Sequence, residues 1–218
     1  MEPKILAQTP QDLVLLKPAG MPAQADATGD LDLLRWAQAK TGEKLYLVHR
    51  LDRPVGGVML LARQAARAAY WSRRFRQHKV RKAYLAITQP PIYPPFGQLT
   101  HYLRKDPQRH RAIISLQPFP QAQLARLQYQ TLAEREGHAL LLIEPQTGRF
   151  HQIRAQLAAL GSPIIGDVKY GYLPPAPDPH SIALWAWRLE DWVAPPPLSP
   201  FPWQLFAPIL KKFFLPTS

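Results

Sequence analysis

Residues 48–58 read Val48-His49-Arg50-Leu51-Asp52-Arg53-Pro54-Val55-Gly56-Gly57-Val58. Two apolar segments, Tyr46–Val48 and Gly57–Ala62, bracket the polar part, so we expect a loop between two core segments. Loops held by rigid strands are where chemistry is usually placed. This loop is therefore the first candidate for a functional site.

Asp52 is the candidate chemical group of the loop, because it lies between Arg50 and Arg53. Nearby cations stabilise an ionised carboxylate, which can then act as a nucleophile or a base. A solvated loop in which three charges balance explains the same string, so the Arg-x-Asp-Arg pattern alone assigns no function.

The segments around this loop have the periodicities of an α/β chain. Leu13–Leu16 is typical of a strand that enters the turn Lys17-Pro18-Ala19-Gly20, and a helix is predicted over Leu31–Lys40. Downstream, Gln64–Lys79 carries apolar residues at helical spacing among many bases, and Lys82–Thr88 alternates as a strand.

The second half of the chain is predicted to be mostly sheet. Gly97–Glu134 contains three candidate strands, of which Ala125–Leu132 has the clearest period of two. Ala139–Ile143 is typical of a buried strand, and Ile182–Leu189 of a last strand. These segments favour an α+β arrangement, with helices beside a sheet.

A further helix is predicted over Arg149–Leu160, with Thr147 as its N-cap and Gly161 as its end. His151 and Arg154 share one helical face, three residues apart. The opposite, core-facing side is expected to carry Ile153, Leu157 and Leu160. A cation in the first turns of a helix points toward something negative, and a surface helix that binds a phosphate fits this pattern as well as a catalytic role.

The composition favours a polyanion as partner. Among 218 residues there are 27 Lys plus Arg and 15 Asp plus Glu, a net charge of +12, which attracts RNA or DNA. Residues 63–82 contribute eight of these bases and no acid. The sequence therefore predicts a nucleic-acid-binding protein with a concentrated basic segment.

Several other classes are disfavoured. The chain has no cysteine, which excludes disulfides and thiolate sites and suits a reducing cytoplasm, and no apolar run is long enough for a bilayer. The seven His residues show no metal-ligand spacing, and no Gly-rich nucleotide-binding motif is present. We therefore expect a cytoplasmic protein, not a membrane protein, without metal or nucleotide cofactor.

Three ordered motifs make the sequence similar to a known family. They are Val48–Val58 as quoted, Arg81-Lys82-Ala83-Tyr84-Leu85-Ala86, and Glu144-Pro145-Gln146-Thr147-Gly148-Arg149-Phe150-His151-Gln152-Ile153-Arg154, the last continuing to Gly171. The chain resembles the RluA-type family of RNA pseudouridine synthases, which carries His-Arg-Leu-Asp, Lys-x-Tyr-x-Ala and Thr-Gly-Arg-x-His-Gln-Ile-Arg in this order. The likeness spans about Leu13 to Leu189.

The resemblance implies an isomerase that converts uridine to pseudouridine in tRNA or ribosomal RNA without a cofactor. It implies that Asp52 is the catalytic carboxylate, that Tyr84 stacks on the uracil, and that Arg154 pairs with Asp52. The target base must leave its stack before a protein carboxylate can reach it. Substrate contacts are expected from His49, Arg50, Arg53, Thr147, Arg149, His151, Gln152 and Ile165.

Three departures from the family pattern concern the loop and its surroundings. The chain has Val55-Gly56-Gly57 where the family usually has Thr-Ser-Gly, Trp185 where it usually has His, and Gln156 in place of another common His. The lost hydroxyl and imidazole groups put substrate choice and rate in doubt more than reaction type.

RNA is expected to be gripped by the catalytic domain itself. Only 51 residues precede Asp52, so we expect one catalytic domain over 1–218, with a core at about 13–189, without the accessory N-terminal RNA-binding domain of many relatives. Phosphate contacts are predicted for Arg67, Arg73, Arg74, Arg76, Lys79 and Arg81, and for Arg104, Lys105, Arg109 and Arg111.

The predicted fold is a single α/β domain of the α+β type, with a mixed, mostly antiparallel sheet and flanking helices, acting as a monomer. One alternative is a non-catalytic RNA-binding or ribosome-assembly protein that retains the fold. A second alternative, a glycosidase, needs two facing acids, for which only Asp52 and Asp167 are near the motifs.

Overall fold

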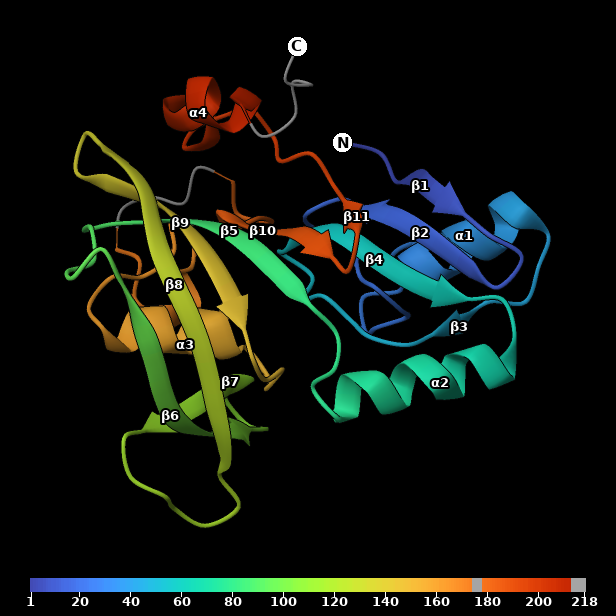
Figure 1. Ribbon diagram of the computed structural model, residues 1–218, viewed down its shortest axis with the longest axis horizontal. Helices are drawn as coiled ribbons and strands as arrows, with labels where there is room; N and C mark the ends of the chain where they lie inside the picture. Colours follow the sequence, from blue (N-terminus) through green and yellow to red (C-terminus); the bar gives the residue numbers. More distant parts are fainter. Residues whose placement is uncertain (174–177, 213–218) are drawn as a thin grey trace. The chain divides into compact units, whose positions relative to one another are not determined.

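The computed structural model describes residues 1–173 and 178–212. They form two units, Met1–Lys82 with Trp185–Ala194, and Ala83–Leu184 with the segment from Pro195 onward. Each unit has its own strands and helices (Figure 1).

The first unit is a mixed sheet in the order β1-β2-β4-β10. Its strands are β1 (Lys4–Gln8), β2 (Asp12–Lys17), β3 (Tyr46–Leu47), β4 (Gly56–Ala62), β10 (Leu184–Leu189) and β11 (Trp192–Val193). Strand β10 is parallel to β4, and the other pairs are antiparallel. Every residue of β2 and β4 is buried, which explains the apolar runs Leu13–Leu16 and Val58–Ala62 within them.

Two helices belong to this unit. Helix α1 (Leu33–Thr41) begins where the Asp32 carboxylate accepts a hydrogen bond from the Arg35 amide, and it ends at Gly42 in a left-handed conformation. Helix α2 (Ala65–Arg76) packs against β3 and β4 and buries Trp71, and it is drawn beside these strands in Figure 1.

The second unit is an antiparallel sheet in the order β5-β9-β8-β6-β7. The strands are β5 (Lys82–Thr88), β6 (Phe96–Asp106), β7 (Arg111–Ser115), β8 (Gln123–Arg135) and β9 (His138–Pro145). In β8, Ala125, Leu127 and Tyr129 are buried and alternate with exposed polar residues, so one face of this strand contributes to the core.

Helix α3 (Gln152–Ala159) packs against β6 and β7 of this sheet. The core there joins Leu103, Ala112, Ala125 and Ala155, with Phe150 and Tyr170 packed beside them. Three short helices, η1 (Val168–Tyr170), η2 (Trp203–Phe206) and α4 (Ala207–Lys212), complete the unit.

The predicted fold class, α+β with a mixed, mostly antiparallel sheet, is confirmed, and each strand and helix expected from the sequence is present. Strands β1 and β11 and the short helices η1, η2 and α4 were not predicted from the sequence. No helix within residues 1–173 and 178–212 has the length and apolarity needed to cross a bilayer.

The predicted start of helix α3 is wrong. The helix begins at Gln152, and its N-terminal flanking residue is His151, at φ 53°, not Thr147. Thr147 is instead buried and donates its hydroxyl to the Gln152 side chain, so it fastens the approach to the helix without capping it. The predicted orientation of helix α3 is also wrong. Arg154, expected opposite the core-facing side, is buried, and Leu160, expected to face the core, is 42% exposed.

Candidate active site

Asp52 lies in the loop between β3 and β4 and is half-buried. The side chains of Leu51 and Val55, on either side, are buried and anchor the loop in the core of the first unit. The amide of Val55 donates to the Asp52 carbonyl over 3.0 Å, which closes a tight turn. The predicted loop position of Asp52 is therefore confirmed.

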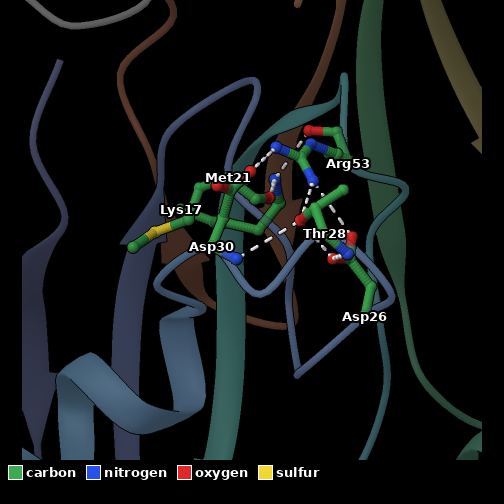
Figure 2. Close-up of polar contacts among 6 residues, drawn as sticks. All are labelled: Lys17, Met21, Asp26, Thr28, Asp30 and Arg53. Carbon is green, nitrogen blue, oxygen red and sulfur yellow. Dashed lines mark hydrogen bonds and ion pairs between the residues drawn. The ribbon is translucent and has the colours of Figure 1, made fainter.

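A fully buried lysine at the end of β2 supports this loop. The ammonium of Lys17 donates to the Pro18 carbonyl over 2.9 Å. It also donates to the carbonyls of Met21 and Arg53, over 2.6 and 3.2 Å (Figure 2). Burial lowers the Lys17 pKa to about 7, while the Asp52 charge raises it and the Arg53 charge lowers it. The Asp52 charge therefore favours the protonated form of Lys17.

Sequence reasoning treated Lys17 only as the first residue of a turn. The sequence signal for its role was a lysine directly after the apolar run Leu13–Leu16 and before a turn. A buried ammonium at such a place needs carbonyl partners, and a nearby turn can supply them.

Arg53 extends from the same loop toward the segment 26–30, as Figure 2 shows. One terminal nitrogen donates to Asp26 over 3.1 Å and to Thr28 over 2.8 Å, and the other bonds to Asp30. These partners raise the Arg53 pKa, Asp30 contributing most. The guanidinium predicted to contact substrate is thus bound by protein groups.

His49 and Arg50 differ in their surroundings. The His49 ring accepts the Leu60 amide over 3.0 Å and stacks on Phe75, with centroids 4.7 Å apart. Burial lowers the His49 pKa to about 3, and the Lys82 charge adds to this effect, so the ring is neutral at pH 7. Arg50 is exposed, and among the described residues it makes no hydrogen bond or ion pair.

Two departures from the family pattern meet in the first unit. Gly56 of β4 is paired with Trp185 of β10, and a Cβ at position 56 would lie 2.3 Å from the Trp185 ring. Next to it, Gly57 has φ 126°, and a Cβ there would lie 2.2 Å from the Ala186 carbonyl oxygen. Gly56 therefore makes room for the Trp185 ring.

In the second unit, Tyr84 lies on β5 opposite Ile143 of β9 and is half-buried. Arg154 is buried in α3 and forms a two-pronged ion pair with Asp167, at 2.7 and 2.9 Å. Its guanidinium carbon also lies 5.2 Å from the centre of the Tyr170 ring. Asp167 orients the arginine, a role that the sequence did not predict.

Four other predicted substrate residues have partners in the protein. The Gln152 side-chain oxygen accepts the Thr147 hydroxyl over 2.7 Å and the Arg149 amide over 3.0 Å. The Arg149 side chain donates to the Leu124 carbonyl over 2.9 Å, and Ile165 is buried. These groups shape the approach to α3, and their contact with substrate stays a prediction.

His151 stands beside the same helix. Its Nδ1 lies 3.0 Å from the Tyr170 hydroxyl, and its ring stacks on Phe150 with centroids 3.8 Å apart. The ring is half-buried between these two aromatic residues.

The basic residues around α2 fall into two groups. Arg67 grips the buried Asp12 carboxylate, while Arg74 and Arg81 pair with Glu190. By contrast, three cations are exposed and form no ion pair within the described part of the chain: Arg73, Arg76 and Lys79. The second group is the one available to phosphates.

In the second unit, the Arg104 side chain donates to the Pro120 carbonyl over 3.1 Å and lies over Phe119. Lys105 lies over Phe150, and Arg109 and Arg111 are exposed. Within residues 1–173 and 178–212, no three His, Asp or Glu side chains cluster in a way that could hold a metal ion.

A family model described as RNA pseudouridylate synthase matches residues 12–159. This chain belongs to the RNA pseudouridylate synthase family. The match covers the Asp52 loop, Tyr84 and Arg154 in one alignment. The resemblance to the RluA-type synthases is confirmed, and with it the prediction of an isomerase that acts on RNA.

Individual relatives agree. This pseudouridine synthase is 34% identical over 187 residues to the tRNA pseudouridine synthase C of Haemophilus ducreyi, covering 79% of this chain and 76% of the relative. It is 30% identical over 173 residues to an RNA pseudouridine synthase of Haemophilus influenzae, covering 78% and 75%.

Solved structures support the fold. Human RNA Pseudouridylate Synthase Domain Containing 4 aligns with a TM-score of 0.69 and 29% identity, over 85% of this pseudouridine synthase and 82% of that chain. Human RNA Pseudouridylate Synthase Domain Containing 1 aligns with a TM-score of 0.78 at 24% identity, over 91% and 85%, which shows the fold alone.

Proposed function

We propose that this pseudouridine synthase isomerises uridine in tRNA, that Asp52 is its catalytic carboxylate, and that the target uridine is flipped out of its stack. Activity on RNA follows from the family. The choice of tRNA rests on relatives that bear the name tRNA pseudouridine synthase C. A relative from Borreliella burgdorferi is named for the large ribosomal subunit, but this chain covers only 44% of it.

The observation that supports the assignment is the place of Asp52 in a loop with the family's His-Arg-Leu-Asp sequence, where its charge raises the pKa of the buried Lys17 ammonium. A carboxylate that acts as a nucleophile must be ionised. The reaction then cleaves the bond between N1 of uracil and C1′ of the ribose. The held base rotates, C5 bonds to C1′, and the C5 proton is lost.

Tyr84 and Arg154 keep the roles that the resemblance implies, as proposals. Tyr84 would stack on the extruded uracil, an interaction that suits a half-buried aromatic side chain on a rigid strand. Arg154 would stabilise the Asp52 carboxylate, and its ion pair with Asp167 would fix the guanidinium for that task.

We also propose that both units make up one catalytic domain with its core at about 13–189, because the single family match runs through parts of both. RNA would contact the exposed cations Arg50, Arg73, Arg76 and Lys79, whereas Arg67, Arg74 and Arg81 serve internal ion pairs. A monomeric cytoplasmic enzyme without a cofactor suits this chemistry.

The test is release of tritium from RNA labelled at uridine C5. The wild-type protein should release tritium from transfer RNA. Asp52→Asn should lower the rate by roughly three orders of magnitude or more, because a neutral amide is a poor nucleophile. The matched control is Asp191→Asn, at an acid that is 91% exposed, which should release tritium at the wild-type rate.

Each result has a clear meaning. A wild-type protein that releases no tritium from any cellular RNA would point to a non-catalytic RNA-binding protein. Full activity of Asp52→Asn, with an unchanged circular dichroism spectrum, would refute the assignment of this carboxylate. Mapping pseudouridine in cells with and without the gene separates tRNA from ribosomal RNA as substrate.

The glycosidase alternative gains no support. It needs two carboxylates that share one pocket, and Asp167 was the only second acid near the motifs. Both oxygens of Asp167 are bound by Arg154, and the residue is 1% exposed. Asp167 is therefore an ion-pair partner and not a general acid.

A further inference from the structure

The Arg53 guanidinium lies at the surface, yet it is hydrogen-bonded to side chains of the segment 26–30. Its side chain and those of Asp26 and Asp30 are 35%, 36% and 53% exposed. Isolated surface ion pairs contribute little, but a network of several charges that share one fork of donors behaves differently. Figure 2 shows the guanidinium directed at Asp26, Thr28 and Asp30 together.

The segment 26–30 is ordered for this contact by its own hydrogen bonds. The Asp26 carboxylate accepts the Thr28 amide over 3.0 Å and the Thr28 hydroxyl over 2.5 Å. The same hydroxyl accepts the Asp30 amide over 3.3 Å. One Asp26 oxygen and the Thr28 hydroxyl thus hold the segment, and the other Asp26 oxygen and Asp30 receive Arg53.

The main chain of Arg53 is held from the opposite direction. Its carbonyl accepts the Gly20 amide over 2.9 Å and the Lys17 ammonium over 3.2 Å. Asp52 precedes this doubly held residue directly, and its own carbonyl is held by Val55. The backbone that carries the Asp52 carboxylate is therefore fixed through Arg53.

The local charge argues against a phosphate at Arg53. Two carboxylates surround one guanidinium, which leaves a net charge of −1 where the rest of the protein has an excess of cations. A phosphate would have to displace a carboxylate and would meet a second one.

We propose that Arg53 is a positioning residue: the clamp formed by Asp26, Thr28 and Asp30 holds Arg53, and Arg53 holds the backbone at Asp52 in its reactive geometry. This inference rests on the proposed role of Asp52. It gives Arg53 a specific task in this chain, and the residues that hold Arg53 belong to a segment outside the sequence motifs.

The test is a cycle of three variants, Arg53→Gln, Asp26→Asn with Asp30→Asn, and the combination of all three. Removing either partner, by Arg53→Gln or by Asp26→Asn with Asp30→Asn, should lower kcat roughly tenfold, because a small misplacement of a reacting group slows the reaction strongly. The combined variant should be no slower than the slower of the other two, since both changes break one interaction. The dissociation constant for RNA and its salt dependence should stay as in the wild type.

Two further measurements separate positioning from RNA contact. Arg53→Lys keeps the charge but lacks the planar fork, so it should resemble Arg53→Gln in kcat. The Gly20 and Val55 amides hold this loop through hydrogen bonds. Their hydrogen exchange should be faster than in the wild type both in Arg53→Gln and in the variant with Asp26→Asn and Asp30→Asn. This exchange does not depend on turnover.

The opposite pattern would overturn the inference. If Arg53→Gln makes the salt dependence of RNA binding shallower by about one charge, while the Asp26 and Asp30 changes tighten binding and spare kcat, Arg53 is an RNA contact. Unchanged kcat in all variants overturns it as well. A wild-type protein without activity refutes the proposed function instead, and the exchange cycle still tests the clamp.

Discussion

At the scale of the residue, positions 56 and 185 must be considered together. Gly56 has no positive φ, but a Cβ there would lie 2.3 Å from the Trp185 ring and 3.0 Å from the Ala19 amide nitrogen. The indole of Trp185 is buried and donates to the Ala194 carbonyl over 3.1 Å. The two departures from the family pattern are therefore coupled: the smaller residue at position 56 of β4 makes room for the larger one at position 185 of β10.

Gly56→Ser should lower the free energy of unfolding by roughly 1–3 kcal/mol, the usual cost of overpacking a core. Chemical denaturation measures this change. The same substitution in a Trp185→His background should cost less, because the smaller ring leaves more space and only the contact with the Ala19 amide nitrogen remains. Equal destabilisation in both backgrounds would contradict a direct contact between the two side chains.

The catalytic candidates were predictable from the sequence, and their supports were not. Asp52, Tyr84 and Arg154 lie within ordered motifs that identify a family on their own. Lys17 and the Asp26–Asp30 segment are recognised only when the turn at 17–21 and the clamp on Arg53 are seen. Side chains that meet across many intervening residues leave no periodic signal in a sequence.

At the scale of the element, α2 shows what a basic pattern can and cannot predict. The helix was expected over nearly the observed residues, and its bases were expected to bind phosphates. Arg67 instead meets Asp12, 55 residues earlier, and Arg74 meets Glu190, 116 residues later. Helical periodicity places cations on a face, but only the tertiary structure identifies the anions beside them.

Arg73→Glu with Arg76→Glu should weaken RNA binding by at least tenfold at moderate salt and make its salt dependence shallower by about two charges. Fluorescence anisotropy with a labelled stem-loop RNA over a series of salt concentrations measures both. Lys4→Glu with Lys40→Glu gives the same change of net charge at exposed lysines elsewhere in the unit. If both double variants weaken binding equally, only the overall charge matters.

At the scale of the whole molecule, His49 links pH to stability. Its pKa is about 3 in the folded protein and about 6.5 when unfolded. Between these values only the unfolded chain binds the proton, so the stability contributed by a neutral His49 is full above pH 6.5 and is lost as the pH falls toward 3. Acid should therefore destabilise the first unit through this ring.

His49→Gln should reduce the loss of stability between pH 7 and about 4.5, because an amide oxygen can still accept the Leu60 amide and does not titrate in this range. Unfolding in urea at both pH values measures the difference. His180→Gln, at an exposed histidine, is the matched control and should follow the wild type. An equal acid sensitivity of His49→Gln and the wild type would contradict a ring that is neutral in the folded protein.

The Gly56 and Trp185 contact also constrains the route by which such a pair arises. Consider an ancestor with serine at position 56 and histidine at position 185. If the histidine were replaced by tryptophan before the serine changed, the ring would lie 2.3 Å from the Cβ at position 56. Glycine first leaves only a small void. Evolution would therefore pass through the glycine intermediate, and a reconstructed lineage should show that replacement on the older branch.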